Sequence, residues 1–291
     1  MRTEWIATVV VWTSVVLGCS SAPATDEASS EAGDGGASHA STTERTADAA
    51  RARDGGASAS PVVDAGSSNA TESRPTGPVP KLLVRGFGKD LDPFIGGLRT
   101  FDDFKKLLQA EGFDPKDAHD LGNYDDSKSM DEMTNEVGAQ LEAAMAKYPS
   151  GTKFDVMGHS LGGIVALRGI FAKNLSSRVR TFVSLSAPIY GQDQKPANCA
   201  LGLSCGDIYD FYTPYNGPKL TAYMAANASS LAAMKLCSLI GPDDGTITAP
   251  MAGAQFPGGT NVVVNGVNHV AVIRSAPATK ALKDQCFGGA F

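Results

Sequence analysis

The sequence lacks several features that would point to common classes of protein. Its net charge of −6 shows no basic excess, and basic and acidic residues are nearly balanced over residues 80–291. Without a basic stripe, nucleic acid is not an expected partner. The most apolar run, Ile6–Leu17, has about a dozen residues, fewer than a membrane-spanning helix needs. Histidine is scarce at four residues, so a histidine base has few candidates.

The apolar run near the start belongs to a targeting segment at residues 1–19. Arg2 precedes it, as a basic residue does in a secretory signal peptide. The run ends in Val16-Leu17-Gly18-Cys19, which resembles a bacterial lipobox, where Cys19 would become the lipidated N-terminus after cleavage. An ordinary signal peptide, with Cys19 incidental, is the alternative. Both interpretations predict export. The lipobox resemblance, together with Ser20 directly after Cys19, implies an outer-membrane lipoprotein.

Residues 20–79 contain no Phe, Trp or Tyr and consist mostly of small and polar residues. Asp-Gly-Gly-Ala-Ser occurs twice, at 34–38 and 54–58. Such a composition buries too little apolar surface to offset the entropy lost on ordering. We therefore predict a disordered tether at 20–79, followed by one catalytic domain at 80–291, which is long enough to form a core.

Strand-like and helix-like stretches alternate over residues 80–291. The expected strands are Lys81–Arg85, a short one within Phe113–Leu121, one through Phe154–Met157, Val179–Ser186, Leu236–Ile240 and Asn261–Val264. The expected helices are Phe101–Ala110, Asp131–Tyr148 and Leu161–Asn174. This alternation predicts an α/β fold, with a mostly parallel sheet flanked by helices on both faces. In such sheets the site lies at the carboxyl ends of the strands.

The strongest chemical signal is Gly158-x-Ser160-x-Gly162, which lies between a strand-like and a helix-like run. A strand, a sharp turn and a helix in this order are typical of a nucleophile elbow, where a strained turn exposes the serine hydroxyl. Glycine two residues before and two after allows neighbouring backbone to approach closely. The helix N-terminus points N–H groups at developing negative charge. Ser160 is therefore the candidate nucleophile, and a glycine-rich turn without chemistry is the alternative.

A serine nucleophile needs a base, and the base needs an acid that orients it. His39 lies in the tether, His119 lies in a polar stretch, and His159 lies inside the elbow, where we expect it to face away from the nucleophile. His269 remains as the candidate base, on a loop after the last expected strand. Asp243 and Asp244, both after Leu236–Ile240, are the candidate acids.

Four cysteines lie beyond Cys19. They are Cys199, Cys205, Cys237 and Cys286. An even number in an exported domain suggests two disulfides, for which three pairings exist. We expect Cys199 to pair with Cys205 across a short loop, which leaves Cys237 for Cys286; free buried thiols are the alternative. We predict no metal site, because the cysteine spacing does not suit zinc and Asp207 and Asp210 lack a calcium ligand series.

Three stretches together resemble bacterial secreted lipases and esterases of the α/β-hydrolase superfamily, in particular the triacylglycerol lipase type. They are Gly-His-Ser-Leu-Gly-Gly at 158–163, Thr-Phe-Val-Ser-Leu-Ser-Ala-Pro at 181–188 and Asn-Gly-Val-Asn-His-Val at 265–270. The chain order serine, aspartate, histidine is that of this superfamily. The resemblance implies an α/β-hydrolase fold and ester hydrolysis through an acyl-enzyme on Ser160, without a cofactor. It favours Asp244 over Asp243, because Asp244 precedes the apolar Ile247 by three residues.

The resemblance also implies an oxyanion hole formed by the main-chain N–H groups of Leu161 and Phe87. Phe87 lies in the loop after the first strand, where Arg85 replaces the usual histidine. The aromatic-rich stretch Ile189–Lys235 would be an insertion before the last two strands that shapes the substrate site. We expect a monomer that acts on an ester or lipid and contacts a membrane through its N-terminal anchor. The alternatives are another acyl hydrolase (a phospholipase, thioesterase or polyester depolymerase) and a catalytically dead binding protein.

Overall fold

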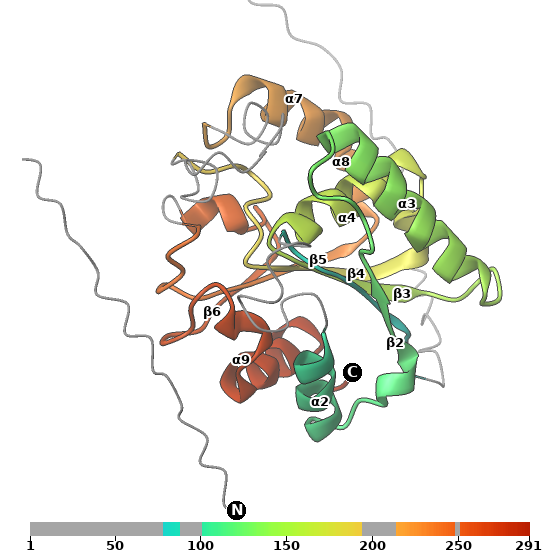
Figure 1. The fold of residues 1–291 in the computed structure, drawn as a ribbon, viewed down its shortest axis with the longest axis vertical. Coiled ribbons are helices and arrows are strands. Elements are labelled where there is room, and N and C mark those ends of the chain that lie inside the picture. The colour runs from blue at the N-terminus through green and yellow to red at the C-terminus, as the bar shows by residue number, and fades with distance from the viewer. Residues whose placement is uncertain (1–77, 88–100, 194–213, 248–250) are drawn as a thin grey trace, which may run out of the picture. The chain divides into compact units, whose positions relative to one another are not determined.

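The computed structural model describes residues 78–87, 101–193, 214–247 and 251–291 (Figure 1). The expected signal peptide and tether, with Cys19 and His39, lie outside the described residues. So do Cys199 and Cys205, and the aspartates 207 and 210. Over the described ranges, no helix combines the length and the apolar character that crossing a membrane requires.

Six parallel strands form one sheet within the described residues, in the order β2–β1–β3–β4–β5–β6. They are β1 (Lys81–Val84), β2 (Ala118–Leu121), β3 (Phe154–His159), β4 (Val179–Leu185), β5 (Lys235–Ile240) and β6 (Thr260–Val263). Strand β1 lies between β2 and β3, so the direction in which strands are added reverses beside it. A reversal of this kind opens a crevice at the carboxyl ends of the two strands concerned, here β1 and β3.

Helices cover both faces of the sheet, as Figure 1 shows. One face carries α3 (Met130–Ala146), α4 (Leu161–Ala172), α7 (Pro218–Ala226) and α8 (Ala228–Ala232), and the other carries α2 (Asp102–Ala110) and α9 (Ala276–Ala281). Side chains of a strand alternate between faces, so Leu82 and Val84 pack into the first core while Leu83 packs into the second. Because both faces are buried, the central strands β1, β3, β4 and β5 are mostly apolar.

The expected fold class is confirmed. The three expected helices and five of the six expected strands begin and end within two residues of their predicted positions, and β2 lies within the stretch predicted to hold it. Helices α7, α8 and α9 are not among the predicted elements. Helix α3 starts one residue earlier than predicted, because Ser129, just before the helix, forms a capping box with Glu132 in its first turn. Helices α7 and α8 lie between β4 and β5, within the stretch expected to be an insertion.

A buried ionic cluster joins the amino ends of β1, β3 and β4. The Nζ of Lys81 lies 3.1 Å from Oδ2 of Asp155, and both side chains are fully buried. Arg180 donates two hydrogen bonds to the same carboxylate, at 2.9 and 2.5 Å. The ring of Phe113 lies 4.4 Å from the Lys81 Nζ. Burial lowers the pKa of Lys81 below its ordinary value, although the Asp155 charge opposes this shift.

A disulfide joins Cys237 of β5 to Cys286 at the end of the turn Leu282–Cys286. This is the pairing expected for these two cysteines. The bond closes a loop with a sequence separation of 49 residues. The loop contains both Asp244 and His269, so it encloses the candidate acid and the candidate base.

Candidate active site

Ser160 lies on a strained turn between β3 and α4. Its φ of 53° and ψ of −130° fall in a region that non-glycine residues rarely occupy. Its N–H donates to the carbonyl of Leu185 at the end of β4 (2.9 Å), and its carbonyl accepts from the N–H of Gly163 (3.0 Å). Strain of this kind persists only where the surroundings fix the backbone, and it concentrates at functional sites.

The glycines of the elbow are required by close backbone contacts. A Cβ added to Gly158 would lie 2.4 Å from the Cα of Gly163, and one added to Gly162 would lie 2.0 Å from the carbonyl oxygen of Arg85. Real Cβ atoms do not approach other atoms so closely. Glycine at these positions therefore allows α4 to begin directly against the ends of β1 and β3, which places Ser160 at the crevice of the sheet.

The structure brings Asp244 and His269 together at the carboxyl ends of β5 and β6. Nδ1 of His269 lies 2.8 Å from Oδ2 of Asp244, and the two side chains are 15% and 4% exposed. The other carboxylate oxygen accepts the N–H groups of Thr246 (2.9 Å) and Ile247 (2.8 Å). Since a carboxylate can only accept, Nδ1 of His269 carries the hydrogen and Nε2 is left as the basic nitrogen.

Burial alone would raise the pKa of Asp244, but the hydrogen bond and charge of His269 and the two main-chain donors outweigh it and lower the pKa. Asp244 is therefore ionised at neutral pH. The neighbouring Asp243 has an exposed side chain. The burial and the contact with His269 thus distinguish two candidate acids that are adjacent in sequence.

His159 connects the elbow to the loop that carries His269, a contact that the sequence analysis missed. Its Nε2 lies 2.8 Å from the main-chain oxygen of His269, and the two rings lie 4.9 Å apart. Burial, followed by the charge of His269, lowers the pKa of His159 to about 3. The ring is therefore neutral, and Nε2–H donates to the carbonyl. No feature of the sequence signals this contact, because the two residues are 110 positions apart.

The loop after β1 approaches the elbow closely enough to share a site with it. A Cβ added to Gly86 would lie 2.9 Å from the Cβ of Ser160. Phe87 follows, and Leu161 is the first residue of α4. Among the described residues, no group accepts a hydrogen bond from the main-chain N–H of Phe87 or Leu161. Phe87 and Leu161, the two predicted oxyanion donors, thus lie in the two segments next to Ser160.

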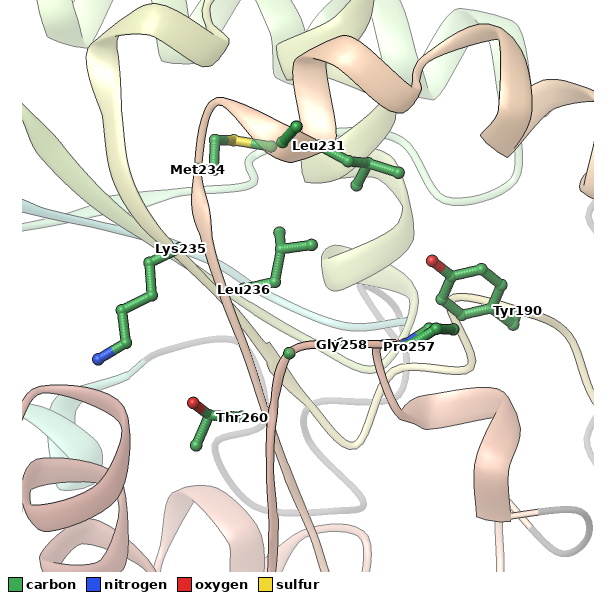
Figure 2. A pocket seen from close by; sticks show the side chains of 10 residues that line it. Tyr190, Leu231, Met234, Lys235, Leu236, Pro257, Gly258 and Thr260 are labelled. Atoms are coloured by element: carbon green, nitrogen blue, oxygen red, sulfur yellow. The ribbon is translucent and has the colours of Figure 1, made fainter. Parts of the chain in front are cut away.

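Two further features of the described residues lie away from this site. His119 lies on β2 at the sheet edge, and its Nε2 is 2.5 Å from the hydroxyl of Tyr148. Within the described ranges, no group of three or more His, Cys, Asp or Glu residues is arranged to hold a metal. A cavity of about 400 Å³, drawn in Figure 2, has walls from the beginnings of β5 and β6, whereas Asp244 and His269 follow the ends of these strands.

Residues 80–232 match the family model described as palmitoyl protein thioesterase, which is a little over half of the chain. The chain belongs to the palmitoyl protein thioesterase family. A comparison with curated proteins gave no match. Family and fold together identify an ester- or acyl-cleaving hydrolase, while the triacylglycerol lipase type stays a prediction.

Two solved structures support the fold. The propeptide form of Bacillus licheniformis lipase BlEst2 is 18% identical, with a TM-score of 0.52 over 71% of this chain and 49% of that chain. Phospholipase PlaB from Legionella pneumophila in complex with thio-NAD is 13% identical, with a TM-score of 0.54 over 73% of this chain and 60% of that chain. The chain thus spans about half and 60% of these two proteins. At such identities the likeness establishes the α/β-hydrolase fold alone.

Proposed function

We propose that this protein is a serine hydrolase that cleaves acyl esters through an acyl-enzyme on Ser160. The observation that carries the proposal is the buried Asp244–His269 pair, held at 2.8 Å and joined through His159 to the turn that presents Ser160. A strained serine, a histidine with Nε2 free to accept a proton and an ionised aspartate are the groups that acyl transfer to serine requires.

In the proposed reaction, Nε2 of His269 takes the proton of Ser160 as Oγ attacks the acyl carbonyl. Asp244 keeps His269 in the required tautomer and stabilises the imidazolium that forms. The N–H groups of Leu161 and Phe87 donate to the oxyanion of the tetrahedral intermediate. His269 then protonates the leaving group. Water then gives a proton to Nε2 of His269 as it attacks the acyl-enzyme. The Ser160 oxygen leaves and takes that proton from His269, and the carboxylic acid is released.

The substrate we propose first is a carboxylic ester of the kind that lipases and esterases cleave, on the strength of the motif resemblance. A long-chain acyl thioester is the second candidate, favoured by membership of the palmitoyl protein thioesterase family. Both substrates pass through a tetrahedral oxyanion, so the same triad and donors serve both. The choice between them depends on the shape of the acyl and leaving-group pockets.

The test compares the full chain with its Ser160→Ala variant on p-nitrophenyl esters from acetate to palmitate, a triglyceride emulsion and palmitoyl-coenzyme A. We expect kcat on the preferred substrate to fall by about 10⁶-fold in the variant. A reactive-serine probe should label the full chain and not the variant. Hydrolysis of the emulsion would identify a lipase, and preference for the thioester would identify a thioesterase. Activity that survives Ser160→Ala would refute the serine mechanism.

We also propose that the protein is exported as a monomer, with Cys19 as its lipidated N-terminus. The lipobox-like stretch supports this, and the Cys237–Cys286 disulfide suits an oxidising compartment. Metabolic labelling with a fatty acid should mark the full chain and leave a Cys19→Ala variant unlabelled. Equal labelling of the two would exclude lipidation at Cys19.

A further inference from the structure

Arg85, the residue that replaces the usual histidine, is buried beside the candidate oxyanion loop. Its Nη1 donates to the main-chain oxygen of Gly86 at 2.8 Å and to Oδ2 of Asp126 at 3.0 Å. Its Nη2 donates to the main-chain oxygen of Tyr124 at 2.5 Å. The side chains of Arg85 and Asp126 are each 7% exposed. The guanidinium is thus held at several points, and one of them is the loop beside Ser160.

The bond to Gly86 matters because of the peptide unit to which that oxygen belongs. The carbonyl of Gly86 and the N–H of Phe87 are parts of one planar peptide group, and in a trans peptide they point in opposite directions. Fixing the carbonyl oxygen therefore fixes the direction of the Phe87 N–H. A charged donor on the oxygen also polarises the peptide, which strengthens its N–H as a donor.

We propose that Arg85 is a positioning residue for the oxyanion hole, because it holds and polarises the Gly86–Phe87 peptide so that the Phe87 N–H faces the oxyanion formed at Ser160. This inference rests on the proposed serine hydrolase function. Arg85 acts through the peptide and does not contact the reacting atoms.

The surroundings of Arg85 hold its guanidinium in one place. The guanidinium carbon lies 4.5 Å from the centre of the fully buried Tyr124 ring. The Tyr124 hydroxyl donates to the main-chain oxygen of Arg85 at 3.0 Å, so the ring and the guanidinium restrain the same segment from two sides. Asp126 balances the charge, which would otherwise be costly to bury. A lysine could not reproduce this arrangement, because an ammonium lacks the planar fork of donors.

The experiment measures kcat, KM and the Ki of an alkylboronic acid for the full chain and for Arg85→Met, Arg85→Lys and Ser160→Ala. The boronic acid adds to a reactive serine and places an oxygen in the oxyanion hole. Removal of one oxyanion donor costs about 10²–10³ in kcat, so a misdirected donor in Arg85→Met should cost about 10- to 100-fold. We expect the boronate Ki to rise by a similar factor while KM stays unchanged. Arg85→Lys, which keeps the stem and charge, should show a smaller loss of several-fold.

Arg168→Met is the matched control. Arg168 is also a buried arginine over a tyrosine ring, 4.6 Å from Tyr223, but it lies on α4 and donates to Thr134 and Asp131. We expect this variant to lower the melting temperature without changing kcat or the boronate Ki. Similar losses in Arg85→Met and Arg168→Met, or an unchanged boronate Ki in Arg85→Met, would overturn the inference. If Arg85→Met does not fold, wild-type kcat in soluble Arg85→Lys would overturn it equally.

The Ser160→Ala variant separates the two proposals. Hydrolysis that persists in this variant would refute the proposed serine hydrolase function itself. Ser160-dependent hydrolysis that is insensitive to Arg85 would remove only the positioning role and leave the function intact.

Discussion

A buried cation lies at each end of strand β1, Lys81 at its start and Arg85 directly after its last residue. The two cations differ in the groups that they contact. At its amino end, Lys81 pairs with Asp155, and at its carboxyl end, Arg85 pairs with Asp126. The remaining contacts of Lys81 are aromatic rings and a carbonyl of its own segment, Val79, at 3.5 Å. Those of Arg85 are the Tyr124 ring and carbonyls of loops, including the one beside Ser160.

If Arg85 has the positioning role proposed above, the same pairing of charges serves stability at the amino edge of the sheet and chemistry at the carboxyl edge. At the amino edge, the side chains of Lys81 and Asp155 are fully buried and have no access to solvent. At the carboxyl edge, Ser160 and His269 remain partly exposed, as a site that admits substrate requires. We therefore expect substitutions at the amino edge to change unfolding and those at the carboxyl edge to change rate.

The largest effect should come from Asp244→Asn at the carboxyl edge. An amide in place of the carboxylate favours the wrong tautomer of His269 and cannot stabilise the imidazolium, so kcat should fall by about 10⁴-fold. Steady-state kinetics on the preferred ester measure this effect. The matched control is Asp243→Asn, which alters an exposed side chain and should leave kcat unchanged. Equal losses in the two variants would contradict the assignment of Asp244 as the acid.

At the amino edge, Asp155→Asn should lower the free energy of unfolding by about 3–5 kcal/mol, because it leaves the Lys81 ammonium buried without its counter-charge. Urea unfolding measures the change, and kcat of the remaining folded protein should equal that of the wild type. In Asp131→Asn, the control, the altered side chain is 80% exposed in its pair with Arg168, and the loss should stay below about 1 kcal/mol. A large drop in kcat for folded Asp155→Asn would contradict the expectation that substitutions at the amino edge change stability and leave the reaction rate unchanged.

Removal of the disulfide tests the loop that holds the acid and the base. The double variant Cys237→Ala, Cys286→Ala should lose about 2–4 kcal/mol of unfolding free energy, as expected for a cross-link that closes a loop of this length. Calorimetry with and without reductant measures it. Reductant should destabilise the wild type more than the double variant, which keeps only the expected Cys199–Cys205 disulfide. Unfolding of the wild type that does not respond to complete reduction would show that the cross-link contributes nothing.

At neutral pH the smallest change concerns His159, whose contribution to stability depends on pH. The native state binds a proton on this ring only near pH 3, whereas the unfolded chain binds it below about pH 6.5. The unfolded state thus holds more protons between these values, so stability falls as pH drops through the window, by up to about 1.4 kcal/mol per pH unit. His159→Gln removes this titration and keeps an N–H donor, so its unfolding free energy should depend less steeply on pH.

Urea unfolding at pH 7, 5 and 4 measures the difference between His159→Gln and the wild type. His119→Gln is the control, because burial also lowers the pKa of His119 but its side chain is only partly buried. We expect His119→Gln to change the pH dependence of the unfolding free energy less than His159→Gln does. If the unfolding free energies of the wild type and His159→Gln depend on pH equally, His159 does not titrate in this way.

The sequence predicts the parts of the site whose chemistry depends on local spacing. Gly158 and Gly162 are recognisable because a side chain at either would clash with backbone, and the strand–turn–helix pattern around Ser160 is local. His269 follows from elimination among four histidines. The order of the strands then brings these segments to one edge, since parallel strands align their carboxyl ends.

The parts that the sequence does not predict are contacts between distant side chains. Asp126 lies 41 residues after Arg85, and their pairing depends on how the loop before α3 returns to the end of β1. His159 and Lys81 also look ordinary in sequence, because burial and partners across the sheet determine their roles. A local motif predicts where backbone segments must approach closely. It does not predict which distant side chain will hold those segments in place.

The order of the site residues along the chain divides the enzyme into two contiguous parts. Phe87, Ser160 and Leu161 all precede the end of β4, whereas Asp244 and His269 follow the start of β5. A cut between β4 and α7 would therefore yield one fragment with the proposed nucleophile and oxyanion donors and another with the proposed acid and base and the disulfide that encloses them. Neither fragment alone holds a complete triad, so this fold offers a natural division point for a split reporter whose signal depends on reassembly.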